Sequence, residues 1–292
     1  MYILETLPGL EESLINEVKG VQILPTLVES NTKKSDIAYV ISKLIAKIKF
    51  KNEKDLLYQI SNLELDIDNN FFVKCKNKEL EKEIAKTLIQ KGFVPDPKTN
   101  NPLKVYLGNG LAIITQTIVI NNEKRAYRFK RHNQSIDSCI ANALILESGI
   151  KKTNSVLDPF CKDSVILIEA FKKGITKLYG FDTYNNIRNS TINAKLAKAS
   201  IIFEETKFDD IIKKTDFCLT TLPIMTKNNF ASKLIDKFFK KIFTLCKTIG
   251  IITYNPDEIK EIIKLNKLSI KKEFNIKKGS QNISIFIFKS KK

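Results

Sequence analysis

From about residue 135 to the end of the chain, short apolar runs alternate regularly with stretches of helical spacing. The runs SVLD, KLYGFD and DFCLTTL are largely apolar on both faces, which is typical of parallel strands covered by helices on both sides. The last two runs, LSIKKEFNI and NISIFIFK, are joined only by KKGSQ, which is too short for a crossover helix. The pattern therefore predicts an α/β domain over residues 126–292, with a parallel sheet that ends in an antiparallel hairpin.

The first 60 residues mix strands and helices in a less regular order. YILETL and VQILPTLVE favour strands, whereas PGLEESLINEVK, with its proline at the start, and NEKDLLYQISNL favour helices. A further helix is predicted over SDIAYVISKLIAKI because its apolar positions recur at helical spacing, at Ile37, Val40, Ile41, Leu44 and Ile45. These elements predict a ferredoxin-like α+β unit over residues 1–60.

A second small α+β unit is predicted over residues 61–125. It begins with a strand in DNNFFVKCK, continues with the amphipathic helix KELEKEIAKTLIQKG, and that helix is closed by Gly92. The runs LKVYL and LAIITQTIVI are separated by GNG, which indicates a β-hairpin. The unit leads directly into the basic stretch KRAYRFKRH.

Composition narrows the class of protein. The 292 residues are 43% hydrophobic and 28% charged, which is ordinary for a folded soluble chain of two or three domains. No run approaches the ~18 apolar residues of a membrane helix, and MYILETLPGLEE has acids where a signal peptide has lysines. The five scattered cysteines and the single histidine argue against a metal site and favour a reducing cytoplasm. We therefore expect a cytoplasmic protein without a membrane partner.

The net charge of +17 suggests a polyanionic partner such as nucleic acid, although a lysine-rich composition explains the bulk charge equally well. The distribution of arginine is more specific, because only four of the 49 basic residues are arginine and three of those four stand in one short stretch. A guanidinium group binds phosphate bidentately and stacks on bases, which an ammonium group does not do. The stretch therefore predicts either an RNA contact or an interdomain clamp, with the RNA contact favoured. Its candidate residues are Lys124, Arg125, Arg128, Lys130, Arg131 and His132.

Four segments resemble one known family: YRFKRHNQSIDSCIANALI, VLDPFCKDSVILIEA, YGFD and DFCLTTLPI. They are similar to the RNA guanine-N2 methyltransferases that carry a THUMP domain, and in size to the archaeal type that modifies tRNA position ten. LPGLEE near the N-terminus also looks like this family, so the resemblance covers essentially the whole chain. It implies a Rossmann-like class I methyltransferase domain, a THUMP-like RNA-binding unit over 61–125, S-adenosylmethionine as cofactor and tRNA as substrate.

The cofactor loop departs from the family motif D-P-F-C-G-S-G-T. Asp158 and Phe160 match it, but Lys162 and Ser164 stand where the resemblance implies glycines. Those glycines allow positive φ and leave room for the amino-acid end of the cofactor. A lysine at this place is bulky and lies near the positive sulfonium and ammonium groups of the cofactor, so it opposes binding. Asp182 in YGFD remains at the strand end where the resemblance implies contact with the ribose hydroxyls.

The catalytic motif N-P-P-Y departs further, because Thr221, Pro223 and Ile224 occupy its first, third and fourth places. In the resembled family, the asparagine and a backbone carbonyl hold the guanine amine while the aromatic ring stacks on the flipped base. Thr221 offers only a shorter hydroxyl group, and Ile224 offers no flat ring. Damage at three places of one active site suggests that the chemistry is lost.

Three functions remain open on this basis. The favoured one is a catalytically inactive methyltransferase-like protein that binds tRNA or another structured RNA and does not use S-adenosylmethionine. Such a protein would act alone, or it would be the RNA-binding subunit in a complex with a catalytic or methyltransferase-activating protein. The second is an active S-adenosylmethionine-dependent tRNA guanine-N2 methyltransferase with divergent motifs. The third is a protein-interaction scaffold. Cys161 beside Lys162 could also form a reactive thiolate, although cysteine is normal at this place of the resembled motif.

Overall fold

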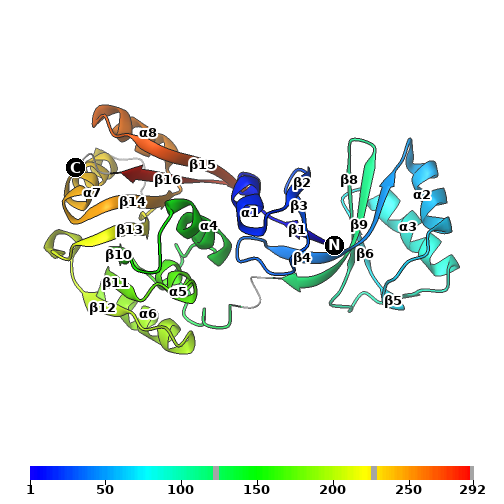
Figure 1. Cartoon of the computed structure of the whole chain (residues 1–292), viewed down its shortest axis with the longest axis horizontal. Helices are drawn as coiled ribbons and strands as arrows, with labels where there is room; N and C mark the ends of the chain where they lie inside the picture. The colour runs from blue at the N-terminus through cyan, green and yellow to red at the C-terminus, as the bar shows by residue number, and fades with distance from the viewer. Residues whose placement is uncertain (121–124, 225–228, 290–292) are drawn as a thin grey trace. The chain divides into compact units, whose positions relative to one another are not determined.

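The computed structural model describes residues 1–120, 125–224 and 229–289. The chain forms two compact units (Figure 1). Unit 1 comprises Met1–Thr6 and Val18–Asn121, and unit 2 comprises Leu7–Glu17 and Asn122–Lys292.

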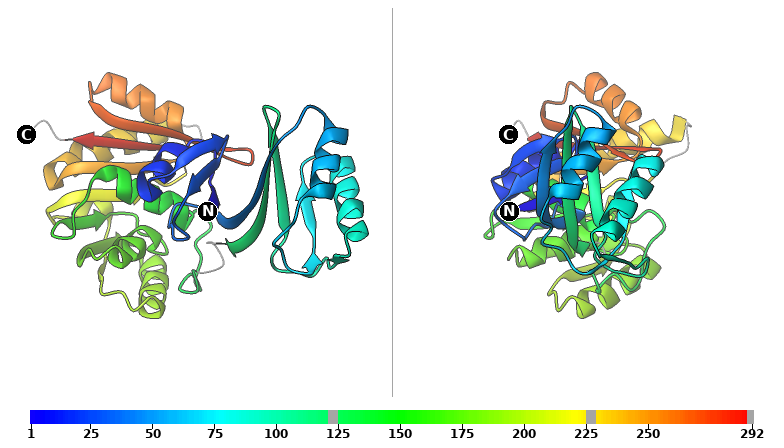
Figure 2. Two further views of the ribbon diagram at one scale, coloured as in Figure 1. Left: turned by 45° about the vertical axis from the view of Figure 1, so that its right-hand side comes forward. Right: turned by 90° about the vertical axis from the view of Figure 1, so that its right-hand side faces the viewer.

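Unit 1 is built on a seven-stranded sheet with the order β2-β3-β1-β4-β9-β8-β6. Figures 1 and 2 show two helices side by side on one face of this sheet, and their buried side chains Leu56, Ile60, Leu80 and Ile84 form a core with it. The two predicted segments 1–60 and 61–125 both contribute strands to this one sheet. The elements are β1 (Tyr2–Glu5), β2 (Val21–Leu24), β3 (Leu27–Ser30), β4 (Val40–Lys49), α2 (Glu53–Asn62), β5 (Asn70–Phe71), β6 (Val73–Cys75), α3 (Lys78–Gln90), β7 (Val94–Pro95), β8 (Leu103–Gly108) and β9 (Leu111–Ile120).

The prediction of a helix over SDIAYVISKLIAKI is wrong. From Val40 onward the segment forms strand β4, which lies in the middle of the sheet between β1 and β9. Two irregularities in its register with β9, at Ile41/Ser42 and at Leu44/Ala46, interrupt the strict alternation of faces. A bulged strand loses the period of two that would identify it, and its apolar residues then mimic helical spacing. Hydrogen bonding to two neighbouring strands decides the conformation, whatever the local pattern favours.

The hairpin predicted around GNG is confirmed, since β8 and β9 pair antiparallel from Gly108↔Leu111 to Leu103↔Gln116. The helix KELEKEIAKTLIQ is also confirmed as α3, whose N-cap Asn77 accepts hydrogen bonds from the backbone N–H groups of Glu79 and Leu80.

Unit 2 carries the second seven-stranded sheet, with the order β12-β11-β10-β13-β14-β16-β15. The pairs among β10 to β14 are parallel, and β16 pairs antiparallel with both β14 and β15. The predicted α/β architecture with a terminal antiparallel hairpin is therefore confirmed. Its elements are α1 (Glu11–Val18), α4 (Ser138–Ser148), β10 (Ser155–Asp158), α5 (Val165–Lys172), β11 (Lys177–Asp182), α6 (Tyr184–Leu196), β12 (Ile202–Glu205), the 3-10 turn Phe208–Asp210, β13 (Thr215–Thr221), α7 (Asn229–Leu245), β14 (Cys246–Thr253), α8 (Pro256–Leu265), β15 (Ile270–Lys278) and β16 (Gln281–Lys289).

Helices cover both faces of the sheet of unit 2, with α4 and α5 on one side and α7 on the other (Figure 1). Phe238 and Phe239 on α7 are buried at 1% and 2% exposure, so the apolar stripe of this helix belongs to the core. The segment Leu7–Glu17 also belongs to this unit, because Pro8 O accepts a hydrogen bond from Lys277 N at 3.1 Å.

The order of the strands defines where a ligand site would lie. Strand β10 lies between β11 and β13, so the chain runs outward from β10 to β11 and β12 and then returns to the other side of β10 at β13. Open α/β sheets bind ligands outside the carboxyl ends of the strands at such a reversal. In this chain those ends are Asp158, Asp182 and Thr221.

Candidate functional site

The loop from Asp158 to Ser164 joins β10 to α5 at the reversal point. Lys162 has φ 52° and Ser164 has φ 65°, so both residues lie in the left-handed region that favours glycine. This conformation costs about 1–2 kcal/mol for a residue with a Cβ atom. The loop therefore follows the course expected of the resembled glycine-rich motif, although it contains no glycine.

The side chain of Lys162 turns into the site and is only 6% exposed. Its Nζ donates to Thr221 O at 3.1 Å and lies 3.5 Å from Gln134 O. The backbone of the same residue is held as well, because its N–H donates to Asp182 Oδ2 at 2.9 Å and its carbonyl accepts from Ser190 Oγ at 2.9 Å. Lys162 thus links the carboxyl ends of β11 and β13 to helix α6.

Asp158 lies at the bottom of the site and is 2% exposed. Its Oδ1 accepts hydrogen bonds from Thr220 Oγ1 at 2.6 Å and from Phe160 N at 3.2 Å. Burial raises the pKa of Asp158 to about 7, while burial lowers the pKa of Lys162 to about 8 despite the neighbouring carboxylates. Both residues line the same small cavity and are poorly solvated, and perturbed pKa values of this kind occur in functional sites as well as in structural ion pairs.

Asp182 ends β11 at the place where the sequence predicts a ribose contact. Its Oδ2 accepts from Lys162 N, and its Oδ1 accepts from Thr183 N and Asn186 Nδ2, both at 2.8 Å. Each carboxylate oxygen thus already accepts a hydrogen bond from the protein.

The residues at the catalytic motif lie at the end of β13. Thr221 is 3% exposed, and its Oγ1 has no hydrogen-bond partner within the residues that the structure describes. Its carbonyl oxygen accepts from Lys162 Nζ. Pro223 is half-buried, whereas Ile224 is 44% exposed and its N–H donates to Gln134 Oε1 at 3.2 Å.

The residues at the amino-acid end of the predicted cofactor site do not fit S-adenosylmethionine in this conformation. The cavity that they enclose measures about 10 Å³, which is the room of about one water molecule. Its lining includes Asp158, Phe160, Lys162 and Thr221, so the predicted cofactor and catalytic residues meet in one place. The Lys162 side chain and its contacts take up the space between them.

Three residues of the loop pack into the interior of unit 2. The ring of Phe160 packs against Phe208 and Phe238, with centroid distances of 5.3 and 6.0 Å. Ser164 is fully buried at the start of α5. Cys161 is 3% exposed, and burial raises its pKa well above the usual range, which disfavours a reactive thiolate.

The predicted RNA contacts divide into an inner and an outer group. Arg125 is 6% exposed, and its Nε donates to Glu169 Oε1 at 3.0 Å. The Arg128 side chain is 8% exposed and donates through Nη2 to Ser135 Oγ at 2.9 Å. The guanidinium groups of these two arginines thus contact protein side chains inside unit 2, and their RNA contact stays a prediction. Lys124 lies outside the described residues.

The outer group consists of Phe129, Lys130 and Arg131, which we call the basic–aromatic loop. Lys130 and Arg131 are exposed, Phe129 is 70% exposed, and Lys130 Nζ lies 5.2 Å from the centre of its ring. The backbone is fixed by the buried Asn193, whose Oδ1 accepts from Lys130 N at 2.9 Å and whose Nδ2 donates to Lys130 O at 2.7 Å. His132 is half-buried next to this loop, and burial lowers its pKa.

Sequence reasoning missed three residues that organise this region. Glu169 is 1% exposed and accepts hydrogen bonds from Arg125, Tyr127 Oη at 2.7 Å and Asn142 Nδ2 at 2.8 Å. Gln134 and Asn193 connect the basic–aromatic loop to the site. An acid inside the apolar stretch VILIEAF is the one signal that could have pointed to Glu169.

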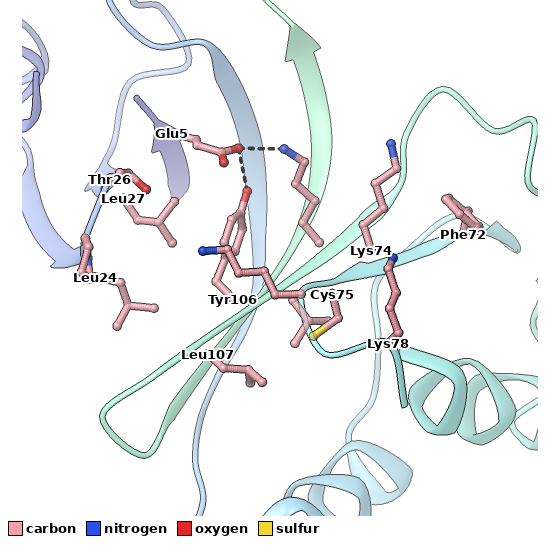
Figure 3. Close-up of a pocket in the computed structure, with 14 residues that line it drawn as sticks. Glu5, Leu24, Thr26, Leu27, Phe72, Lys74, Cys75, Lys78, Tyr106 and Leu107 are labelled. Atoms are coloured by element: carbon pink, nitrogen blue, oxygen red, sulfur yellow. Dashed lines mark hydrogen bonds and ion pairs between the residues drawn. The ribbon is translucent and has the colours of Figure 1, made fainter. Parts of the chain in front are cut away.

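Unit 1 contains a larger cavity of about 520 Å³, shown in Figure 3. Its lining includes four lysines, namely Lys74, Lys76, Lys78 and Lys104, together with apolar side chains such as Leu24 and Leu107. The carboxylate of Glu5 accepts from Lys104 Nζ at 2.7 Å and from Tyr106 Oη at 2.9 Å, as the dashed lines in Figure 3 show. The lining is thus mainly cationic and apolar.

Two general findings concern the part of the chain that the structure describes. No cluster of histidine, cysteine or acidic side chains there has an arrangement that could hold a metal ion. None of the helices described is both long and apolar enough to span a bilayer.

The parallel sheet with its antiparallel end and the site at the reversal point define a class I methyltransferase fold. A family model described as "RMKL-like, methyltransferase domain" (UPF0020) matches residues 125–282, and the chain belongs to this family. No curated protein matches the sequence significantly.

Solved structures agree with this fold at low sequence identity. TrmN from Thermus thermophilus superposes with a TM-score of 0.85 at 16% identity, covering 99% of both chains. SMU.472, crystallised in complex with SAH, has a TM-score of 0.78 at 15% identity and covers 100% of this chain and 98% of its own. A protein described as a possible methylase, from Clostridium difficile 630, has a TM-score of 0.76 at 16% identity and covers 100% of this chain and 98% of its own.

Proposed function

We propose that this chain is a methyltransferase-like protein that binds tRNA or another structured RNA and catalyses no methyl transfer. The observation that carries the second part is the Lys162 ammonium group on the carbonyl of Thr221. This contact occupies the space between the strand ends where the family would hold the reacting groups. The loss of a flat ring at Ile224 points in the same direction.

The basic–aromatic loop supports the RNA-binding part. Single-stranded nucleic acid is bound by cations that contact phosphates together with exposed aromatic rings that stack on bases. Phe129, Lys130 and Arg131 offer both kinds of group on a backbone that Asn193 fixes. Little ordering entropy is then lost on binding. In unit 1, the lysines around the large cavity add a second cationic surface, which fits a THUMP-like role in RNA binding.

The first test is binding of fluorescently labelled bulk tRNA to the wild-type chain at two salt concentrations. A protein with about six phosphate contacts loses roughly 10³-fold in affinity between about 50 and 200 mM salt. We expect a steep loss of this kind. Absent binding, or binding that does not change with salt, would contradict the RNA-binding part of the proposal.

The second test is transfer of a radiolabelled methyl group from S-adenosylmethionine to the same tRNA. We expect no incorporation above a heat-denatured control, because Lys162 fills the amino-acid end of the cofactor site. Incorporation that scales with protein concentration would contradict the non-catalytic part and would leave the RNA-binding part intact.

A divergent active methyltransferase is the second candidate, and one observation favours it. The loop keeps its positive-φ course at Lys162 and Ser164, and Asp158 and Asp182 remain at their strand ends. A rearranged Lys162 side chain would then be required. Methyl incorporation in the second test distinguishes this candidate from the first.

A further inference from the structure

The ammonium group of Lys162 is buried in the site and is held there by a hydrogen bond and by nearby negative charges. Its Nζ donates to the carbonyl of Thr221 at 3.1 Å, and the negative charges of Asp158, Asp182 and Asp163 favour its ammonium form. Placing an ammonium group in so dry a place is unfavourable unless hydrogen bonds and opposite charges compensate it. The site supplies both, so it is built to receive a cation.

The backbone of the same residue is in an unfavourable conformation. Glycine would adopt φ 52° without penalty, whereas lysine does so at a cost of about 1–2 kcal/mol. The hydrogen bonds of its N–H to Asp182 and of its carbonyl to Ser190 hold this conformation in place. The side chain is consequently directed into the site by a loop that has little freedom to turn it elsewhere.

We propose that Lys162 is a resident cation that closes the cofactor site from within, and that removing its side chain alone makes the site able to bind S-adenosylmethionine or SAH. The inference rests on the proposed function, because it explains how the family's cofactor site became closed. The carbonyl of Thr221, which now accepts from the lysine ammonium, would be released to contact the α-ammonium group of the added ligand. The cavity of about 10 Å³ would be enlarged by the volume of the lysine side chain.

The test is calorimetric titration of SAH into the wild-type chain, Lys162→Gly and Lys162→Met. Lys162→Gly removes the plug and relieves the backbone, whereas Lys162→Met keeps most of the side-chain volume and removes only the charge. We expect Lys162→Gly to bind SAH at least about tenfold more tightly than the wild type, a factor that corresponds to about 1.4 kcal/mol. If the volume of the side chain closes the site, Lys162→Met should bind SAH as weakly as the wild type. If both variants bind SAH more tightly than the wild type, the positive charge of Lys162 closes the site.

Two results would overturn the inference. One is a wild-type chain that binds SAH as tightly as Lys162→Gly, which would also contradict the proposed loss of cofactor binding. The other is a folded Lys162→Gly variant, with a cooperative thermal transition, that binds no better than the wild type. Lys162→Ala provides the same comparison if the glycine variant does not fold. Failure of the wild type to bind tRNA would instead contradict the proposed function and leave this result unchanged.

A measurement on the wild-type chain needs no variant. Reductive methylation of the native protein, followed by peptide mass spectrometry, compares the reactivity of Lys162 with that of the exposed Lys264 on α8. We expect Lys162 to react much more slowly, because its amine is buried and donates a hydrogen bond to the carbonyl of Thr221, so the reagent cannot reach it. Labelling of Lys162 at the rate of Lys264 would show that the side chain does not occupy the site.

Discussion

Unit 2 contains two groups of cations that have opposite environments. Arg125, Arg128 and Lys162 are directed inward, where they contact Glu169, Ser135 and the carbonyl of Thr221. Lys130 and Arg131 are exposed beside the ring of Phe129. The two groups look alike in a sequence with a net charge of +17. The difference teaches that one basic stretch can direct some cations into the interior and leave others exposed, and that only the exposed ones are available to a polyanionic partner.

The largest effect is expected from removing the partner of a buried cation. Glu169→Ala would remove the buried carboxylate that accepts hydrogen bonds from Arg125 Nε and Tyr127 Oη, and breaking a buried ion pair costs about 3–5 kcal/mol of unfolding free energy. Denaturant unfolding followed by circular dichroism measures this loss. The exposed Glu204→Ala on β12 is the matched control, expected to change stability by no more than about 0.5 kcal/mol. If both changes lowered the unfolding free energy equally, the buried ion pair of Glu169 would contribute no more to stability than an exposed acid does.

The pH dependence of stability tests the buried acid next to Lys162. The folded pKa of Asp158 is raised to about 7 from 3.8, so between these values the folded state holds a proton that the unfolded state has lost. The contribution of Asp158 to the unfolding free energy should therefore fall as pH rises from about 4 to about 7, by at most roughly 4 kcal/mol. The difference between wild type and Asp158→Asn, measured by urea unfolding at several pH values, isolates this contribution. A difference that is constant over this range would contradict the raised pKa.

A smaller effect is expected from the exposed ring of the outer group. Phe129→Ala should weaken RNA binding by about 1–3 kcal/mol if the ring stacks on a base. Phe129→Leu keeps apolar bulk without a flat face and should lose nearly as much. Thermal unfolding should change little for either variant, because Phe129 is 70% exposed. Wild-type affinity in the leucine variant would rule out stacking.

The smallest effect is expected from single charges on the basic–aromatic loop. Lys130→Ala and Arg131→Ala should each lower the slope of log affinity against log salt concentration by roughly 1. Lys264→Ala removes one exposed charge from α8 and should leave the slope unchanged. If all three variants shift the slope equally, RNA binding depends on net charge rather than on this loop.

The architecture of unit 2 could be predicted because its signals are local. Runs apolar on both faces indicate buried parallel strands, and the short link KKGSQ requires an antiparallel pair. Strand β4 could not be predicted in this way, since its register irregularities with β9 exist only once the sheet has formed. The residues of the candidate site likewise divide into those that local sequence signals identified and those that only their contacts reveal. Lys162 and Ser164 were identified as residues at glycine-type positions, whereas Gln134, Asn193 and Glu169 became visible only through their contacts.

The sequence by itself determined the class of fold of unit 2, the loop that departs from the family motif, and the basic stretch that follows unit 1. Only the tertiary structure decided which cations face inward. Arg125 lies three residues from Arg128 and six from Arg131, and nothing in that spacing states which guanidinium group will meet Glu169. Burial and pairing depend on residues that are distant in the chain, and the free energy of a buried charge is set by those partners. For the same reason, the sequence indicated that Lys162 was out of place, and only the structure showed what its ammonium group contacts.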